Sequence, residues 1–146
     1  MAAPELPSRE LIMGVAAINV LDNSDRRLAG AVEARFEPIT WCLQPWTGIT
    51  YEGKQSYLIA AGLVLTKQTR SGFRFSIGWA PSYYHRGGGK DLGGELEFYS
   101  FGEIGWMFPN QHVISLRFGH ISNAGFKSYN PGTELLELGY SFPLRW

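Results

Sequence analysis

The chain has 146 residues, enough for one domain with one core, and we expect a single domain over residues 1–146. Its 13 basic residues balance 13 acidic ones and no basic run stands out, which argues against nucleic-acid binding. Aromatic residues make up 14% of the chain and charged residues only 18%, whereas about a quarter of an ordinary soluble domain is charged. This composition favours a protein in contact with lipid.

A membrane-spanning helix is excluded by the absence of about 18 consecutive apolar residues. The longest candidate, residues 11–20, contains Gly14 and Asn19. The first ten residues lack the basic region and apolar core of a secretory signal, so we interpret the chain as a mature sequence with a start methionine. The single cysteine, Cys42, excludes an internal disulfide and a multi-cysteine metal site.

Eight extended segments, rich in β-branched and aromatic residues and separated by Gly, Asn, Asp, Ser or Pro, follow one another along the chain. They are residues 10–20, 28–38, 46–52, 56–66, 72–84, 92–108, 111–122 and 133–145. Between the second and third, two prolines in residues 38–45 cannot donate to a ladder, so we expect a longer turn or a short helix there. The pattern predicts an all-β fold.

Several of these segments alternate with period two, so that one face is apolar and the other polar. In the fifth, Phe73, Phe75 and Ile77 share one face and Arg74 and Ser76 the other. The charged face would fill a narrow barrel interior, where its members pair with one another. The expected interior charges are Glu33, Arg35, Glu37, Arg74, Glu95, Glu97, Glu103, Arg117 and Glu137.

Alternation alone leaves open which face points outward, because a soluble lipocalin-like barrel has the same two faces reversed. Aromatic residues crowd the segment ends, as the interfacial girdles of a membrane barrel require, and Trp146 provides an aromatic C-terminus on the apolar face. We therefore predict an eight-stranded antiparallel transmembrane β-barrel with its apolar face in lipid. The expected girdle residues are Trp41, Trp46, Tyr51, Tyr57, Trp79, Tyr83, Trp106, Phe108 and Tyr140.

With eight strands, both termini face the periplasm and the connections after the odd strands lie outside the cell, where loops are longer. The segments 20–27, 84–91 and 123–132 fit outer loops. Residues 67–71 and 109–110 fit inner turns, and residues 52–55 are short for an outer loop.

Three groups with catalytic chemistry share the apolar parity at the outer end of the last two segments. His120 and Ser122 are two residues, roughly 7 Å, apart on the seventh, and Glu134 returns on the same face of the eighth. A hydroxyl needs a base to become a nucleophile, and an imidazole needs a partner at its other nitrogen. The three residues therefore indicate an acyl-transfer site that faces lipid, and its substrate would be lipopolysaccharide in the outer leaflet.

A simpler interpretation exists for each residue alone, because polar side chains at strand ends near a headgroup layer are commonly just solvated. That interpretation gives no reason for all three to share the outward parity at one end of adjacent strands. His112 shares this parity but lies roughly 26 Å away toward the inner surface, where we expect an interfacial role. His85 lies in the connection after the fifth segment, whose triple glycine and Lys90 lack P-loop spacing.

The last 30 residues or so resemble the lipid A 3-O-deacylases of the PagL family. The resemblance rests on Phe-Gly-His-Ile-Ser-Asn-Ala-Gly-Phe at 118–126, Asn-Pro-Gly-Thr-Glu at 130–134 and Gly-Tyr-Ser-Phe at 139–142. It implies Ser122 as nucleophile, His120 as general base, Glu134 as its orienting acid and Asn130 as a side-chain donor to the oxyanion. Asn123 matches a further motif position, with a turn-forming role as the alternative.

The resemblance implies a carboxylic ester hydrolase of the Gram-negative outer membrane that acts on lipid A without metal or cofactor, and it permits a homodimer. Arg86, Lys90 and Lys127 are candidates for contacts with the phosphates of lipid A, the alternative being ordinary solvated loop cations. The alternative from another class is a non-enzymatic outer-membrane barrel that adheres or binds through its loops. The combination of His120, Ser122 and Glu134 distinguishes the two.

Overall fold

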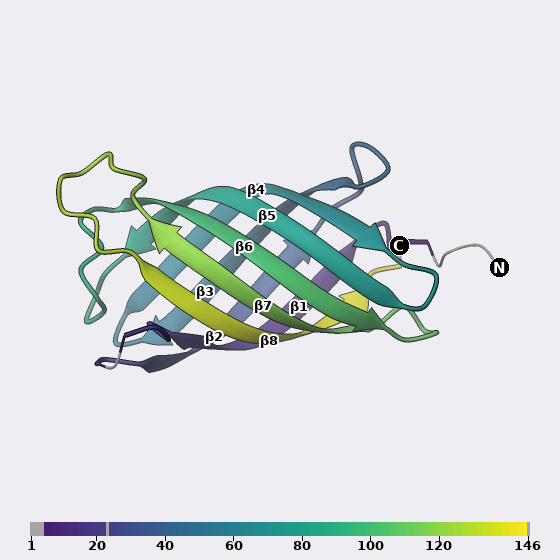
Figure 1. The fold of residues 1–146 in the computed structure, drawn as a ribbon, viewed down its shortest axis with the longest axis horizontal. Helices are drawn as coiled ribbons and strands as arrows, with labels where there is room; N and C mark the ends of the chain where they lie inside the picture. Colours follow the sequence, from purple (N-terminus) through teal and green to yellow (C-terminus); the bar gives the residue numbers. More distant parts are fainter. Residues whose placement is uncertain (1–4, 23, 146) are drawn as a thin grey trace.

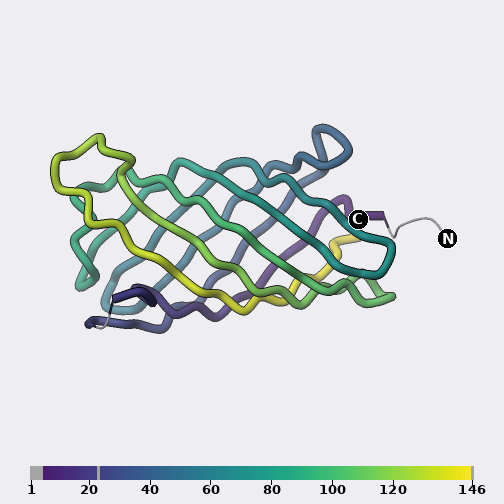
Figure 2. The backbone as a smooth tube through the Cα atoms, viewed as in Figure 1, coloured from purple at the N-terminus to yellow at the C-terminus, as the bar shows by residue number. Residues whose placement is uncertain are grey.

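The computed structural model describes residues 5–22 and 24–145, which form a closed antiparallel barrel (Figures 1 and 2). Each strand pairs with its neighbour in sequence, and β1 closes the barrel by pairing with β8. No helix in these two ranges is long and apolar enough to cross a membrane. The strands are β1 (Glu10–Ile18), β2 (Arg27–Arg35), β3 (Leu43–Gly53), β4 (Ser56–Gln68), β5 (Phe73–His85), β6 (Leu96–Met107), β7 (Val113–Ser122) and β8 (Thr133–Pro143).

The alternation of the sequence becomes an apolar outer wall and a polar interior. On β5, Phe73, Phe75 and Ile77 are exposed, whereas Arg74 and Ser76 between them are buried. A soluble barrel of lipocalin type would bury the apolar face instead. The predicted eight-stranded transmembrane barrel with its apolar face in lipid is therefore confirmed.

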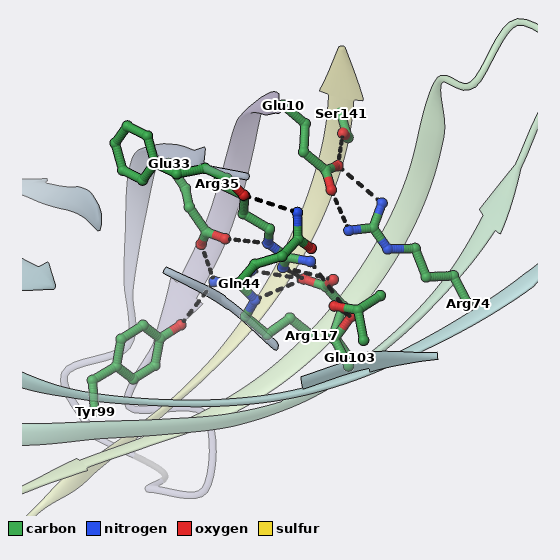
Figure 3. A network of polar contacts seen from close by, with 12 residues as sticks. Glu10, Glu33, Arg35, Gln44, Arg74, Tyr99, Glu103, Arg117 and Ser141 are labelled. Carbon is green, nitrogen blue, oxygen red and sulfur yellow. Dashed lines mark hydrogen bonds and ion pairs between the residues drawn. The ribbon is translucent and has the colours of Figure 1, made fainter. Parts of the chain in front are cut away.

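The barrel interior is filled by a network of ion pairs (Figure 3). Arg35 contacts Glu33 at 2.8 Å and Glu103 at 2.9 Å, and Arg117 contacts the same two carboxylates at 2.7 Å each. All four side chains are almost fully buried. Because each charge has partners of opposite sign, the high cost of burying it is offset.

Two of the nine expected interior charges are wrong. Glu37 and Glu95 are exposed, because β2 ends at Arg35 and β6 begins only at Leu96, so both residues lie outside the ladder. Glu37 instead pairs with Arg9 at 2.7 Å. Glu10 takes an interior place that the sequence pattern did not assign, and it pairs with Arg74 and Ser141.

Eight of the nine expected girdle residues are exposed or partly exposed, although Trp79 lies in the middle of β5 and not at a strand end. Trp46 is instead buried in the interior and packs edge-on against Tyr99 and Phe101. It lies opposite Arg35 in the register, on the inward parity. Trp146 lies outside the described residues, and so do residues 1–4 of the expected mature N-terminus.

The segment around residues 38–45 forms a turn without a helix, and β3 begins at Leu43, earlier than predicted. Pro45 is tolerated in this strand. The Phe36 N–H donates to the Pro45 carbonyl at 2.9 Å, and this hydrogen bond needs no N–H from proline.

The two ends of the barrel differ in their connections. The first and last described residues lie at one end, where the turns between β2 and β3, β4 and β5, and β6 and β7 are also found (Figure 1). The 123–132 loop and the β5–β6 connection extend from the other end (Figure 2). This loop-rich end corresponds to the predicted outer end.

The β5–β6 connection is longer than predicted, because residues 92–95 fold over the barrel mouth instead of extending β6. Leu92 is buried at 2% exposure, and its carbonyl accepts a hydrogen bond from the Asn123 side chain at 3.2 Å. Gly93 has a φ of 91°, and a Cβ there would lie 1.9 Å from the Tyr129 carbonyl oxygen. This close contact joins the connection to the 123–132 loop.

Candidate active site

The three predicted catalytic residues lie on the lipid-facing wall at the loop-rich end. β7 and β8 pair antiparallel, and the register sets His120 directly opposite Glu134. Their side chains point outward, as do those of Phe118 and Leu136 below them. The period of the strands thus brings an imidazole and a carboxylate together at a strand end.

The His120–Glu134 contact has the geometry of an oriented base. Nδ1 of His120 lies 3.1 Å from Oε1 of Glu134, with 47% of the histidine side chain and 23% of the glutamate side chain exposed. A carboxylate at this distance accepts the Nδ1 proton, which leaves Nε2 free to act as an acceptor. Nε2 is the nitrogen that a general base would use.

Ser122 ends β7 two residues after His120, on the same side of the strand, and lies opposite Phe98 of β6. Its hydroxyl accepts a hydrogen bond from the Ala124 amide at 3.4 Å. Within the described part of the chain it makes no hydrogen bond to His120. Hydrogen bonds between nucleophile and base are often long in unliganded sites and tighten when substrate binds.

Asn123 and Asn130 have different surroundings: one is buried under the 123–132 loop and the other is exposed. Oδ1 of Asn130 accepts the Asn123 amide hydrogen at 3.0 Å, which leaves the Asn130 side-chain NH₂ as a donor at the exposed surface. The Asn123 side chain is fully buried, and its NH₂ donates to the carbonyls of Leu92 and Tyr129 at 3.2 and 2.8 Å. Its Oδ1 accepts from the Gly125 amide at 3.1 Å, as in an Asx turn. Asn123 therefore supports the loop, and the Asn130 NH₂ donates to no residue among those that the structure describes.

Gly132 packs against His120, a contact that the sequence reasoning missed. Its φ is 63°, and a Cβ at this position would lie 3.1 Å from Cε1 of His120 and 3.2 Å from the Ile121 carbonyl oxygen. Glycine is the residue that fits both the left-handed backbone and the close approach. The Asn-Pro-Gly motif is the signal that could have located this contact.

The three candidate phosphate-binding cations have different environments. Arg86 pairs with Asp91 at 3.4 Å, with both side chains mostly exposed, and Lys127 is exposed beside Gly94. Lys90 instead points toward the barrel mouth, where Nζ donates to Oδ1 of Asn19 at 3.0 Å and to the Gly132 carbonyl at 2.9 Å. The three are not brought together as one cluster.

The other two histidines lie apart from this site. His112 packs against the rings of both Tyr140 and Phe142, with centroid distances of 5.5 and 5.4 Å. This position precedes β7, at the opposite end of the strand from His120. His85 ends β5, where it stacks on Tyr57 at 5.0 Å.

Comparisons with known proteins agree with the fold. A structure described as the outer membrane enzyme PagL superposes with a TM-score of 0.70 at 22% identity, covering 92% of this chain and 99% of that one. Neisserial surface protein A superposes with a TM-score of 0.69 at 14% identity, covering 99% and 100%. At these identities the likeness shows the eight-stranded outer-membrane barrel fold alone.

Sequence comparison shows the family. The lipid A deacylase PagL of Bordetella bronchiseptica is 34% identical over 53 residues, which span 36% of this chain and 30% of that protein. The family model for lipid A 3-O-deacylase (PagL) matches residues 23–143. Because this match covers most of the barrel and both strands that carry His120, Ser122 and Glu134, the chain belongs to the PagL family of outer-membrane β-barrels.

Proposed function

We propose that this protein is a serine esterase that hydrolyses the 3-O-linked acyl chain of lipid A in the outer leaflet of the outer membrane. The observation that carries the proposal is the 3.1 Å contact between His120 Nδ1 and Glu134 Oε1 on the lipid-facing wall, with Ser122 following on the same strand. The family match and the name of the Bordetella relative, a lipid A deacylase, support the reaction and the substrate.

In the proposed reaction, Ser122 is the nucleophile and attacks the ester carbonyl at the 3-position, while Nε2 of His120 takes the hydroxyl proton. Glu134 stabilises the imidazolium through Nδ1. The imidazolium then returns the proton to the departing 3-hydroxyl of the sugar. Water, activated by the same nitrogen, hydrolyses the acyl-enzyme, so that the products are 3-O-deacylated lipid A and a free fatty acid.

Asn130 is proposed to stabilise the oxyanion. Its Oδ1 is held by the Asn123 amide at 3.0 Å, so the orientation of its NH₂ group is set before substrate binds. A donor held in advance needs no reorganisation during the reaction, which makes it effective in a water-poor site.

The location of the site supports a membrane substrate. The residues around His120 on the outer wall, including Phe98, Phe118 and Leu136, are apolar and exposed or partly exposed. An ester that enters laterally from the leaflet would place its acyl chain against this wall and its sugar toward the loops. Arg86 and Lys127, on those loops, remain candidates for phosphate contacts.

The test is mass spectrometry of purified lipid A incubated in detergent with the wild type and with Ser122→Ala. We expect the wild type to remove one hydroxyacyl chain and Ser122→Ala to lose about 10⁶-fold in turnover. Folding is checked for both by the shift in gel mobility on heating. We expect Ser122→Ala to fold, because it removes only one partly exposed hydroxyl. Unchanged lipid A with a well-folded wild type would refute the substrate and favour a non-enzymatic binding barrel.

A further inference from the structure

The backbone of the catalytic acid is held from inside the barrel mouth by two residues that are distant in sequence. The two residues are Asn19 and Lys90. Each of the three consecutive residues Gly132, Thr133 and Glu134 makes a hydrogen bond to one of them through an oxygen atom. The Gly132 carbonyl accepts from Lys90 Nζ at 2.9 Å, the Thr133 hydroxyl donates to Oδ1 of Asn19 at 3.4 Å, and the Glu134 carbonyl accepts from the Asn19 amide at 2.7 Å.

The two residues are also joined to each other and to the barrel. Lys90 Nζ donates to Oδ1 of Asn19 at 3.0 Å, and the Lys90 carbonyl accepts from the Tyr84 hydroxyl at 2.9 Å. Asn19 is 2% exposed, has a φ of 61°, and donates from its side chain to the Ser24 carbonyl at 2.9 Å. Lys90 is therefore fixed at both its backbone and its ammonium group.

We propose that Lys90 is a positioning residue for the active site, which acts through Gly132 on His120 and Glu134. The inference rests on the proposed esterase function. The carbonyl of Gly132 faces Lys90, while its Cα lies against the His120 ring, close enough that a Cβ would be 3.1 Å from Cε1. Drawing this carbonyl toward the barrel mouth sets the distance between the Gly132 backbone and the imidazole.

A contact with a substrate phosphate is the competing role for Lys90. Two of the three ammonium hydrogens are already directed at Asn19 and Gly132, and the side chain is only partly exposed. An ammonium group with two internal acceptors is a hydrogen-bond donor to the fold. The phosphate role remains available to Arg86 and Lys127, whose side chains are exposed or mostly exposed.

The experiment compares Lys90→Met, which keeps the length of the side chain but removes its charge and donors, with Lys90→Arg, which retains donors. Lys54→Met is the matched control, because Lys54 is an exposed lysine of the same barrel end, on the β3–β4 turn. Two rates are measured on folded protein: deacylation of lipid A with and without its phosphate groups, and covalent labelling of Ser122 by a fluorophosphonate probe.

We expect Lys90→Met to lower kcat and the labelling rate roughly 10- to 100-fold, as misplacements of about 1 Å do, with little change in KM. The loss should be the same on phosphorylated and dephosphorylated lipid A. Lys90→Arg should recover most of it, and Lys54→Met should match the wild type. A structural role alone would change stability but leave both rates of the folded protein intact.

The inference is overturned if folded Lys90→Met labels and turns over at wild-type rates, or if its defect is a raised KM that disappears with dephosphorylated lipid A. If Lys90→Met does not fold, Asn19→Gly takes its place, because glycine keeps the positive φ and removes the shared acceptor; it should show the same loss of kcat. Wild-type protein that labels but leaves lipid A unchanged would refute the substrate only, since labelling still tests Lys90.

Discussion

Two regions of the barrel wall pair glutamate carboxylates with nitrogen-containing side chains: the interior network around Arg117 and the outward-facing His120–Glu134 pair. Glu103 and Glu33 each contact two arginines, and their side chains are at most 6% exposed. Glu134 contacts a single imidazole and is 23% exposed. A carboxylate surrounded by permanent cations is locked in place for structure, whereas one paired with a titratable ring can support proton transfer.

The two groups also come from the same strand. Arg117 and His120 are both on β7, three residues apart, and the pleat sends them to opposite sides of the wall. Residue parity thus separates a group that stabilises the barrel from one that we propose performs chemistry. Substitutions on the interior side should therefore lower stability, and substitutions on the outer side should lower activity.

Among the substitutions that compare the two sides of the wall, the largest effect is expected for Arg117→Met. Removing this guanidinium leaves Glu33 and Glu103 short of a partner in the interior, which should lower the free energy of unfolding by about 3–5 kcal/mol. Urea unfolding in detergent, followed by tryptophan fluorescence, measures the change, and Arg70→Met in the exposed β4–β5 turn is the control. If the folded variant also lost its esterase activity, the separation of the two sides would be wrong.

The next effect concerns the oxyanion. Asn130→Ala should cut kcat by the ~2.7–4 kcal/mol typical of one lost donor, about 10²–10³-fold, with the barrel still folded. Asn130→Asp is the matched variant, because it keeps an oxygen to accept the Asn123 amide and lacks the NH₂ group. Steady-state kinetics on lipid A should find both variants impaired; an active Asn130→Asp would mean that Asn130 only supports the loop.

The smallest effect is expected for Gly132→Ala, with Gly125→Ala as its control. Both glycines have positive φ, so alanine should cost each about 1–2 kcal/mol of stability. Only the Gly132 methyl group would meet His120, whereas a Cβ at Gly125 has nothing within 4 Å. We expect a roughly tenfold loss of kcat for Gly132→Ala alone, since the displacement is a fraction of an ångström. Equal kinetics for the two variants would show that His120 tolerates the contact.

Much of the site followed from local pattern. His120, Ser122 and Glu134 were placed on one face from strand parity, and the structure sets His120 opposite Glu134 as the antiparallel return requires. The errors lie at strand ends. Glu37 and Glu95 were misplaced because β2 and β6 are shorter than their apolar patterns. Trp46 was misplaced because β3 begins earlier than its pattern, which puts Trp46 inside the strand, opposite Arg35 and on the inward parity.

The sequence by itself determined the all-β fold, the apolar outer wall and the outward parity of the proposed catalytic residues, because side-chain direction in a strand repeats every two residues and needs no knowledge of distant contacts. Only the tertiary structure decided how the loops meet. Lys90 reaches Asn19 and Gly132 across separations of 71 and 42 residues. No local pattern encodes such contacts, since they depend on how barrel closure brings the β1 end, the β5–β6 connection and the start of β8 around one mouth.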